Sequence, residues 1–219
     1  MKYYILSHAS DQKVIGEYPQ TKPTEAPYQN GLFDPDSRSN LENDKFPEIP
    51  PKLDLELDKK AKLTDIISAS NIQAVGLFIN EKVKNILSEF NILNHEFYEG
   101  SLSHNGKTDP YFWLHIVNDS LKGIDFENSI FAETDLFGDK VNEVRVDSES
   151  DWYIKNKECE DMNFLNADKL VFTANFMDRN YDIFLFPYIH HYIIVSERVI
   201  QSLEDFKITG YHIKKADFI

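Results

Sequence analysis

The sequence predicts an α+β fold with a largely antiparallel sheet and a few packed helices. The main observation is a duplication: residues 76–98, GLFINEKVKNILSEFNILNHEFY, recur in degraded form as residues 192–214, YIIVSERVIQSLEDFKITGYHIK. Each copy combines a short apolar strand, a capping residue, an amphipathic helix and a second strand. Strand-like apolar runs separated by turn residues fill the chain between the copies. Strands and helices arranged in this way are typical of α+β proteins.

The elements before the first copy are short. Residues 1–10 carry a brief apolar run without the features of a signal peptide, and we interpret them as a first strand. Residues 17–51 are rich in proline and polar residues and predict a loop. In Lys52–Leu57, KLDLEL, leucines alternate with charged residues, which predicts a half-buried strand, and a short helix is predicted near Leu63.

The helix of each copy is predicted from a single apolar stripe. The residues at three-and-four spacing are Val83, Ile86, Leu87 and Phe90 in the first copy and Val199, Leu203 and Phe206 in the second. Asn80 and Ser196 are placed to cap the first turns. We therefore expect Phe90 and Phe206 to be buried in equivalent helix-to-sheet contacts.

Between the copies, His95–Ser101 and Tyr111–Val117 have the composition of strands. Asn105 and Gly106 predict the tight turn of a hairpin that joins them, with Pro110 shortening the start of the second strand. Ile124–Phe131 is predicted as another strand.

The chain is expected to divide into a small, loop-rich amino-terminal region, residues 1–57, and a main α+β domain, residues 58–219. Its 37 acidic residues against 23 lysines and arginines give a net charge of −14, which argues against binding to nucleic acid phosphates and suits a basic partner. A single cysteine, Cys159, cannot form an intramolecular disulfide, so we expect a cytoplasmic protein. No apolar stretch is long enough to predict a membrane span.

No metal, cofactor or catalytic site is predicted. The histidines that could bind a metal have no ligand spacing: His95, His104, His115, His190, His191 and His212. Neither a nucleophile elbow nor a glycine-rich phosphate loop occurs, and the acidic neighbours of Cys159 disfavour a thiolate. A hydrolase that uses histidines and carboxylates stays open as an alternative, as does a scaffold or regulatory binding module.

The order of these segments resembles a family of bacterial immunity proteins found in polymorphic toxin and contact-dependent antagonism systems, long known only as a domain of unknown function. The resemblance is carried by PKLDLELDKKAKLTDIISAS, INEKVKNILSEFNILNHEFYEGSLSHNGK, YFWLHIVND, IDFENSIF and VSERVIQSLEDFKITGYHIK. These motifs contain mostly core and capping residues, so they specify a fold more strongly than an activity. The resemblance implies a cytoplasmic protein that binds and blocks a cognate toxin, without catalysis of its own.

An acidic inhibitor would suit a toxin with a basic active-site cleft. Residues 133–161 contain ten acidic residues against four basic ones. We expect the partner to bind at the acids that stand beside two of the aromatic residues of this segment, through Asp147, Glu149, Asp151, Trp152 and Tyr153. A second patch is expected from Asp34, Asp36, Asp54, Glu56 and Asp58. The sequence does not predict an oligomeric state.

Overall fold

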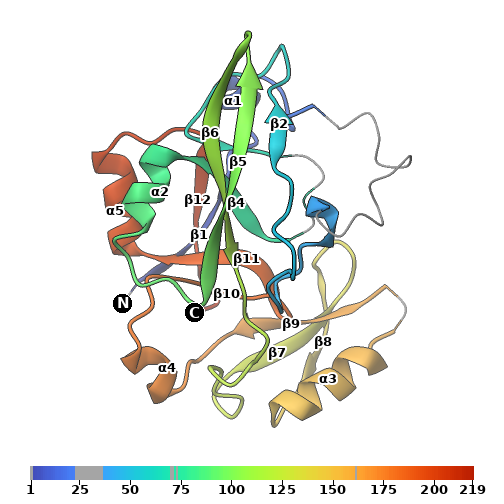
Figure 1. Cartoon of the computed structure of the whole chain (residues 1–219). Coiled ribbons are helices and arrows are strands. Elements are labelled where there is room, and N and C mark those ends of the chain that lie inside the picture. The colour runs from blue at the N-terminus through green and yellow to red at the C-terminus, as the bar shows by residue number, and fades with distance from the viewer. Residues whose placement is uncertain (1, 23–36, 70–71, 73, 161) are drawn as a thin grey trace.

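The computed structural model describes residues 2–22, 37–69, 72, 74–160 and 162–219 (Figure 1). In this part of the chain, twelve strands form three sheets, and every strand pair except β2–β5 is antiparallel. The predicted α+β fold is thus confirmed. The α-helices are α1 (Gln12–Ile15), α2 (Glu81–Leu87), α3 (Glu149–Glu158), α4 (Ala174–Asp178) and α5 (Glu197–Asp205), and a 3₁₀ turn spans Arg38–Asn40.

Each sheet draws strands from distant parts of the chain. The four-stranded sheet has the order β10 (Ile183–Phe186), β11 (His190–Ser196), β1 (Tyr3–His8) and β12 (Tyr211–Lys215). The five-stranded sheet has the order β2 (Asp54–Glu56), β5 (His95–His104), β6 (Lys107–Ile116), β4 (Gly76–Asn80) and β3 (Ile66–Ile67). The three-stranded sheet has the order β8 (Lys140–Val144), β7 (Ile130–Thr134) and β9 (Phe164–Lys169).

The sequence duplication corresponds to two strand–helix–strand units, β4–α2–β5 and β11–α5–β12. In each unit a third strand lies between the two parallel ones and pairs antiparallel with both: β6 in the first unit and β1 in the second. The strands that the sequence predicts at residues 1–10 and 52–57 are present as β1 and β2. Because β1 and β2 pair with strands from the rest of the chain, the predicted boundary near residue 57 does not separate two sheets.

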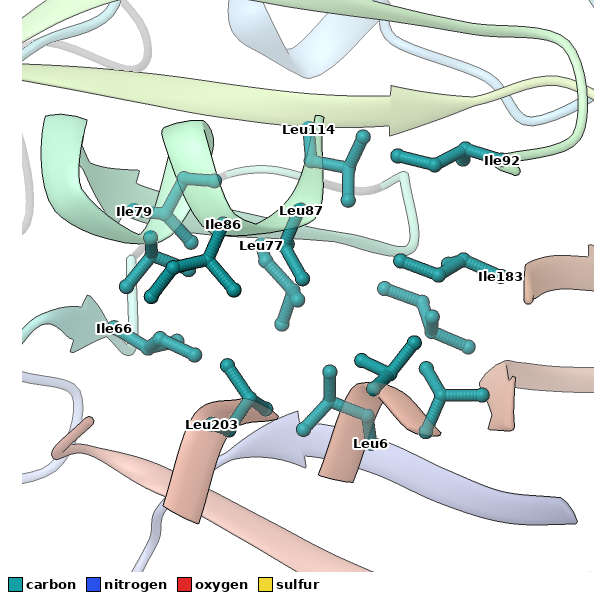
Figure 2. Close-up of a cluster of buried hydrophobic side chains, with 14 of the residues drawn as sticks. Leu6, Ile66, Leu77, Ile79, Ile86, Leu87, Ile92, Leu114, Ile183 and Leu203 are labelled. Atoms are coloured by element: carbon teal, nitrogen blue, oxygen red, sulfur yellow. The ribbon is translucent and has the colours of Figure 1, made fainter. Parts of the chain in front are cut away.

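The two units pack against each other through a shared apolar core. Figure 2 shows Ile79, Ile86 and Leu87 of the first unit converging on Leu203 of the second and on Leu6 of β1, and all five side chains are buried. Alternate residues of β1, β10 and β11 face the opposite side of their sheet, where they join Phe131, Trp152 and other buried residues of the three-stranded sheet and α3. The four-stranded sheet therefore lies between two cores.

Two aspartates, Asp65 and Asp182, each brace the two units against each other through hydrogen bonds. The Asp65 carboxylate, just before β3, accepts hydrogen bonds from Asn80 Nδ2 of the first unit, at 2.8 Å, and from the Thr209 backbone N–H and hydroxyl of the second unit, at 2.8 and 2.7 Å. Asp182, just before β10, accepts hydrogen bonds from Ser196 Oγ at 2.7 Å and from the Asn91 backbone N–H at 3.2 Å. Each aspartate thus connects the start of one helix to the loop that follows the other helix.

This bracing changes the expected role of one cap. Asn80 caps α2 as predicted, because its side chain accepts the Val83 backbone N–H at 3.1 Å. Ser196 has cap-like backbone geometry, but its side chain makes no cap hydrogen bond. Its hydroxyl instead donates a hydrogen bond to the Asp182 carboxylate, which is buried and requires hydrogen-bond donors.

The prediction that Phe90 and Phe206 are both buried is wrong. Phe206 is 56% exposed and Phe90 is half-buried. Both sit where α2 and α5 end, and each meets a cation from the opposite helix: Lys82 Nζ donates to the Phe206 backbone oxygen at 2.8 Å, and the Arg198 guanidinium lies 5.7 Å from the centre of the Phe90 ring. The two phenylalanines are therefore equivalent in that each contacts a cation from the other helix, and not in their burial.

Two predicted elements also differ. The residues after Leu63 form no helix; Ile66 and Ile67 pair with β4 as a buried edge strand. The strand expected at Ile124–Phe131 begins only at Ile130, because Asp125 closes a turn by accepting backbone N–H groups through its carboxylate and its carbonyl.

The predicted hairpin turn is confirmed, since Asn105 and Gly106 both have positive φ. Pro110 lies inside β6 and does not shorten it. Proline is tolerated there because β4 pairs with β6 only from Tyr111 onward, so no strand requires the missing N–H on that side.

Candidate partner-binding surface

The structure places the predicted partner-binding residues in two separate groups. Asp54, Glu56 and Asp58 lie on and beside the edge strand β2, and the other group lies at the start of α3. Figure 1 shows β2 and α3 at opposite ends of the molecule, so the two groups do not form one continuous patch. Asp34 and Asp36 lie outside the described residues.

The β2 group is exposed because the leucines between the acids are buried. Leu53, Leu55 and Leu57 pack into a core on the outer face of the five-stranded sheet, which leaves the alternate side chains facing solvent. The acids have local partners: Asp54 accepts the Ser101 hydroxyl at 2.6 Å, Glu56 pairs with Lys22, and Asp58 accepts the Lys60 backbone N–H at 2.8 Å.

In the α3 group, the acidic residues shape the start of the helix. Ser148 caps α3 by accepting the Asp151 backbone N–H, and Asp151 pairs with Lys155 at 2.7 Å. This pair lowers the pKa of Asp151. Asp147 pairs with Arg145 at 2.7 Å. Glu149 accepts the Leu121 backbone N–H at 2.9 Å and so ties α3 to the preceding loop.

The two aromatic residues of this group belong to the core. Trp152 is only 2% exposed, so its ring cannot contact a partner unless α3 moves. Tyr153 is partly buried, with its ring centre 5.3 Å from that of Trp152 and 5.5 Å from that of Tyr188. Burial raises the pKa of Tyr188 to about 12. The structure therefore removes Trp152 from the surface of the folded chain, while partner binding by the acids and Tyr153 stays a prediction.

Sequence reasoning missed an exposed apolar tip on the β7–β8 hairpin. Leu136 and Phe137 occupy its turn and are 59% and 91% exposed. The Asp135 carboxylate accepts the backbone N–H groups of Phe137 and Asp139, each at 2.9 Å, and Gly138 supplies positive φ. The signal was present in DLFGD: the aspartates and the glycine favour a turn, and two large apolar residues inside a turn have no core to enter.

Other apolar side chains extend this tip along the three-stranded sheet. Phe164 on β9 is half exposed and lies opposite Thr134, at the end of β7 that leads into the turn. Val141 on β8 is also about half exposed. The tip and these neighbours, Leu136, Phe137, Val141 and Phe164, form what we call the hairpin patch.

A cavity lies at the other end of the same hairpin. Its volume is about 540 Å³, and apolar residues that include Phe126, Phe131 and Val146 line it beside three carboxylates, Glu127, Glu143 and Asp147. Arg145 also borders the cavity, and its hydrogen bond to Asp147 raises the pKa of the guanidinium. The structure thus brings Asp147 together with two acids that the sequence did not single out.

The histidines do not converge. His115 on β6 is buried and its Nε2 lies 2.7 Å from the Glu42 carbonyl, whereas His190 on β11 lies 3.1 Å from the Ala167 carbonyl. Burial lowers the pKa of His190 to about 4. Within the described ranges, no three histidine, cysteine or acidic residues are grouped to hold a metal ion. Burial, with the charge of Glu133, raises the pKa of the Cys159 thiol.

Comparison with known proteins adds a family. The model of a family described as Immunity protein family (Imm11) matches residues 2–217, nearly the whole chain. No curated protein matches the chain. In the part of the chain that the structure describes, no helix has the length and apolar character needed to cross a membrane.

Proposed function

The chain belongs to the Immunity protein family (Imm11), and from this premise we propose that it neutralises a cognate bacterial toxin by binding it, without catalysis, in the cytoplasm of the producing cell. The toxin belongs to a polymorphic toxin system in this proposal. The observation that carries the proposal is the match over residues 2–217, because it covers both strand–helix–strand units and the three-stranded sheet.

Charge supports a basic partner. The chain carries a net charge of −14, and an acidic inhibitor approaches a basic toxin faster through electrostatic steering. Two acids of the α3 group, Asp147 and Asp151, already pair with cations of this chain, so steering depends on the overall excess of negative charge as well as on any one carboxylate. We place the acidic contact at Asp147, Glu149, Asp151 and Tyr153, with the β2 group as the second candidate.

Co-expression tests the binding function. The protein encoded immediately upstream is expressed with and without this chain, and growth and co-purification are measured. We expect the chain to restore growth and to purify with that protein in a one-to-one complex. Neither rescue nor co-purification would contradict the proposal.

Charge reversal separates the two acidic groups. Asp147→Lys and Asp54→Lys alter exposed positions at opposite ends of the molecule, so each serves as the matched control for the other. We expect Asp147→Lys to lower the association rate constant about tenfold at low salt and to leave dissociation nearly unchanged. Equal rates for both variants and the wild type would refute the acidic contact, while leaving toxin binding itself intact.

One feature favours an enzyme as the second candidate: the cavity that places Glu127, Glu143 and Asp147 beside apolar walls. A hydrolase could use paired carboxylates, but no histidine is among the described residues that line this cavity. Glu143→Gln, which removes one charge at the cavity, should retain full protection if the chain acts by binding. Loss of protection with unchanged toxin affinity would favour catalysis.

A further inference from the structure

We infer that the hairpin patch is the anchor of the toxin interface: Leu136 and Phe137 enter an apolar pocket of the toxin whose rim carries lysine or arginine. This inference rests on the proposed function and identifies a contact that the acidic composition does not predict. Scattered exposed apolar residues are ordinary on protein surfaces. The hairpin patch differs in its rigidity, its clustering and its flanking charges.

The turn holds both apolar side chains outward at little entropic cost. Besides the two hydrogen bonds to its carboxylate, Asp135 donates its backbone N–H to the Asp139 carbonyl at 3.0 Å and accepts the Gly138 N–H on its own carbonyl at 3.0 Å. Four hydrogen bonds therefore order a five-residue turn. A preordered loop loses less conformational freedom when it binds, so more of the apolar contact appears as affinity.

The residues around the tip indicate which kind of partner binds it. Val141 and Phe164 add apolar surface beside it, and Asp135 and Asp139 stand on either side of Leu136 and Phe137. An apolar centre with a charged rim is the composition of a protein interface. Lys140 follows Asp139 but pairs with Glu143 and Asp168, so the rim keeps a net negative charge and suits a pocket on the toxin with a basic rim.

Two other occupants fit less well. A membrane surface that contains anionic lipid would repel the two aspartates and the net charge of −14. A symmetric contact between two copies of this chain would bring Asp135 and Asp139 near their own copies. The observations therefore favour a protein partner of opposite charge.

Affinity measurements with single variants test the inference. The toxin is used in a catalytically inactive form, and Kd is measured by calorimetry for the wild type, Leu136→Ala, Phe137→Ala and a matched control, Phe206→Ala, which changes an exposed phenylalanine on the distant α5 end. We expect Phe137→Ala to raise Kd at least about 30-fold, the usual threshold of a binding hot spot. Leu136→Ala should raise Kd about tenfold, and Phe206→Ala should leave it unchanged. Thermal unfolding should show that Phe137→Ala is as stable as the wild type, because its ring contacts little of the fold.

The outcomes separate this inference from the proposed function. Wild-type binding with an unchanged Kd for both tip variants would overturn the inference and leave toxin binding in place, whereas no wild-type binding would overturn both. Vesicles of phosphatidylcholine, with and without phosphatidylserine, test the membrane alternative, and light scattering tests self-association. Loss of vesicle binding or of a dimer in Phe137→Ala, with unchanged toxin affinity, would overturn the inference in favour of that occupant.

Discussion

Truncating Leu203 and Phe206 separately measures how the second copy of the duplicated unit is packed. Both residues lie on the apolar stripe of α5 in the sequence, but Leu203 is fully buried in the core between the two units and Phe206 is 56% exposed. From the sequence pattern alone, truncating the larger side chain, Phe206, is expected to destabilise the fold more. From the burial in the structure, truncating Leu203 is expected to destabilise it more.

The magnitudes follow from the burial of each side chain. Leu203→Ala removes apolar carbons at about 0.8 kcal/mol each and leaves a cavity, so we expect a loss of about 3–4 kcal/mol in the free energy of unfolding. Full burial of an aromatic ring contributes roughly 1.5–3 kcal/mol. Phe206 has less than half of that burial, so Phe206→Ala should cost only about 1 kcal/mol.

The free energy of unfolding is measured by urea denaturation. The fluorescence of Trp113 and Trp152 reports unfolding, because both side chains are buried in the folded chain. Leu87→Ala is the matched control, because Leu87 occupies the equivalent position on α2 and is equally buried. It should cost about as much as Leu203→Ala. A cost for Phe206→Ala that equals or exceeds the cost for Leu203→Ala would refute this reasoning.

Three further predictions concern the bracing, a histidine and a turn. Ser196→Ala leaves the buried Asp182 carboxylate without its hydroxyl donor, so the free energy of unfolding measured in urea should fall by about 2–3 kcal/mol; a loss below about 0.5 kcal/mol would contradict the bracing. In the folded chain His190 has a pKa of about 4, so it stays neutral until the pH approaches 4. In the unfolded chain its pKa is about 6.5, and it takes up the proton near that pH. Stability should therefore fall as the pH drops from 6.5 to 4, by at most about 1.4 kcal/mol per unit from this group, and urea titrations of His190→Gln across that range should show a shallower slope. Gly210 has φ +84°, and a Cβ there would lie 2.1 Å from the Ile66 carbonyl oxygen, so Gly210→Ala should lower the free energy of unfolding by more than about 2 kcal/mol. At Gly106, with φ +74° and open space around it, Gly106→Ala should cost about 1 kcal/mol, and equal losses in the two variants would show that the contact with Ile66 is unimportant.

The candidate surface was predictable only in part. The acidic segment at residues 133–161 was visible in the sequence, and the structure places most of its described part, residues 133–160, on one hairpin and one helix. Its composition gave no indication that Asp147 and Asp151 pair with Arg145 and Lys155. An aromatic residue beside acids reads as exposed, yet Trp152 is the buried residue of α3 and shares a core with residues of β9 and of the four-stranded sheet.

The sequence by itself determined the local units. Alternating leucines in β2, the apolar stripes of α2 and α5 and the Asn105–Gly106 turn are specified by side-chain periodicity and backbone preference within a few residues. Those preferences act locally, so they can be read without knowing the fold.

Only the tertiary structure decided which strand completes each unit and which side chains reach solvent. β1 lies between β11 and β12, nearly two hundred residues along the chain. Asp65 and Asp182 join the two units by hydrogen bonds to Thr209 and Asn91, which are 144 and 91 residues away in the sequence. Burial depends on how the layers assemble. Leu203 on α5 is buried between the two units, whereas Phe206 follows the last residue of the helix and points into solvent, although Ile208 two residues later is buried again.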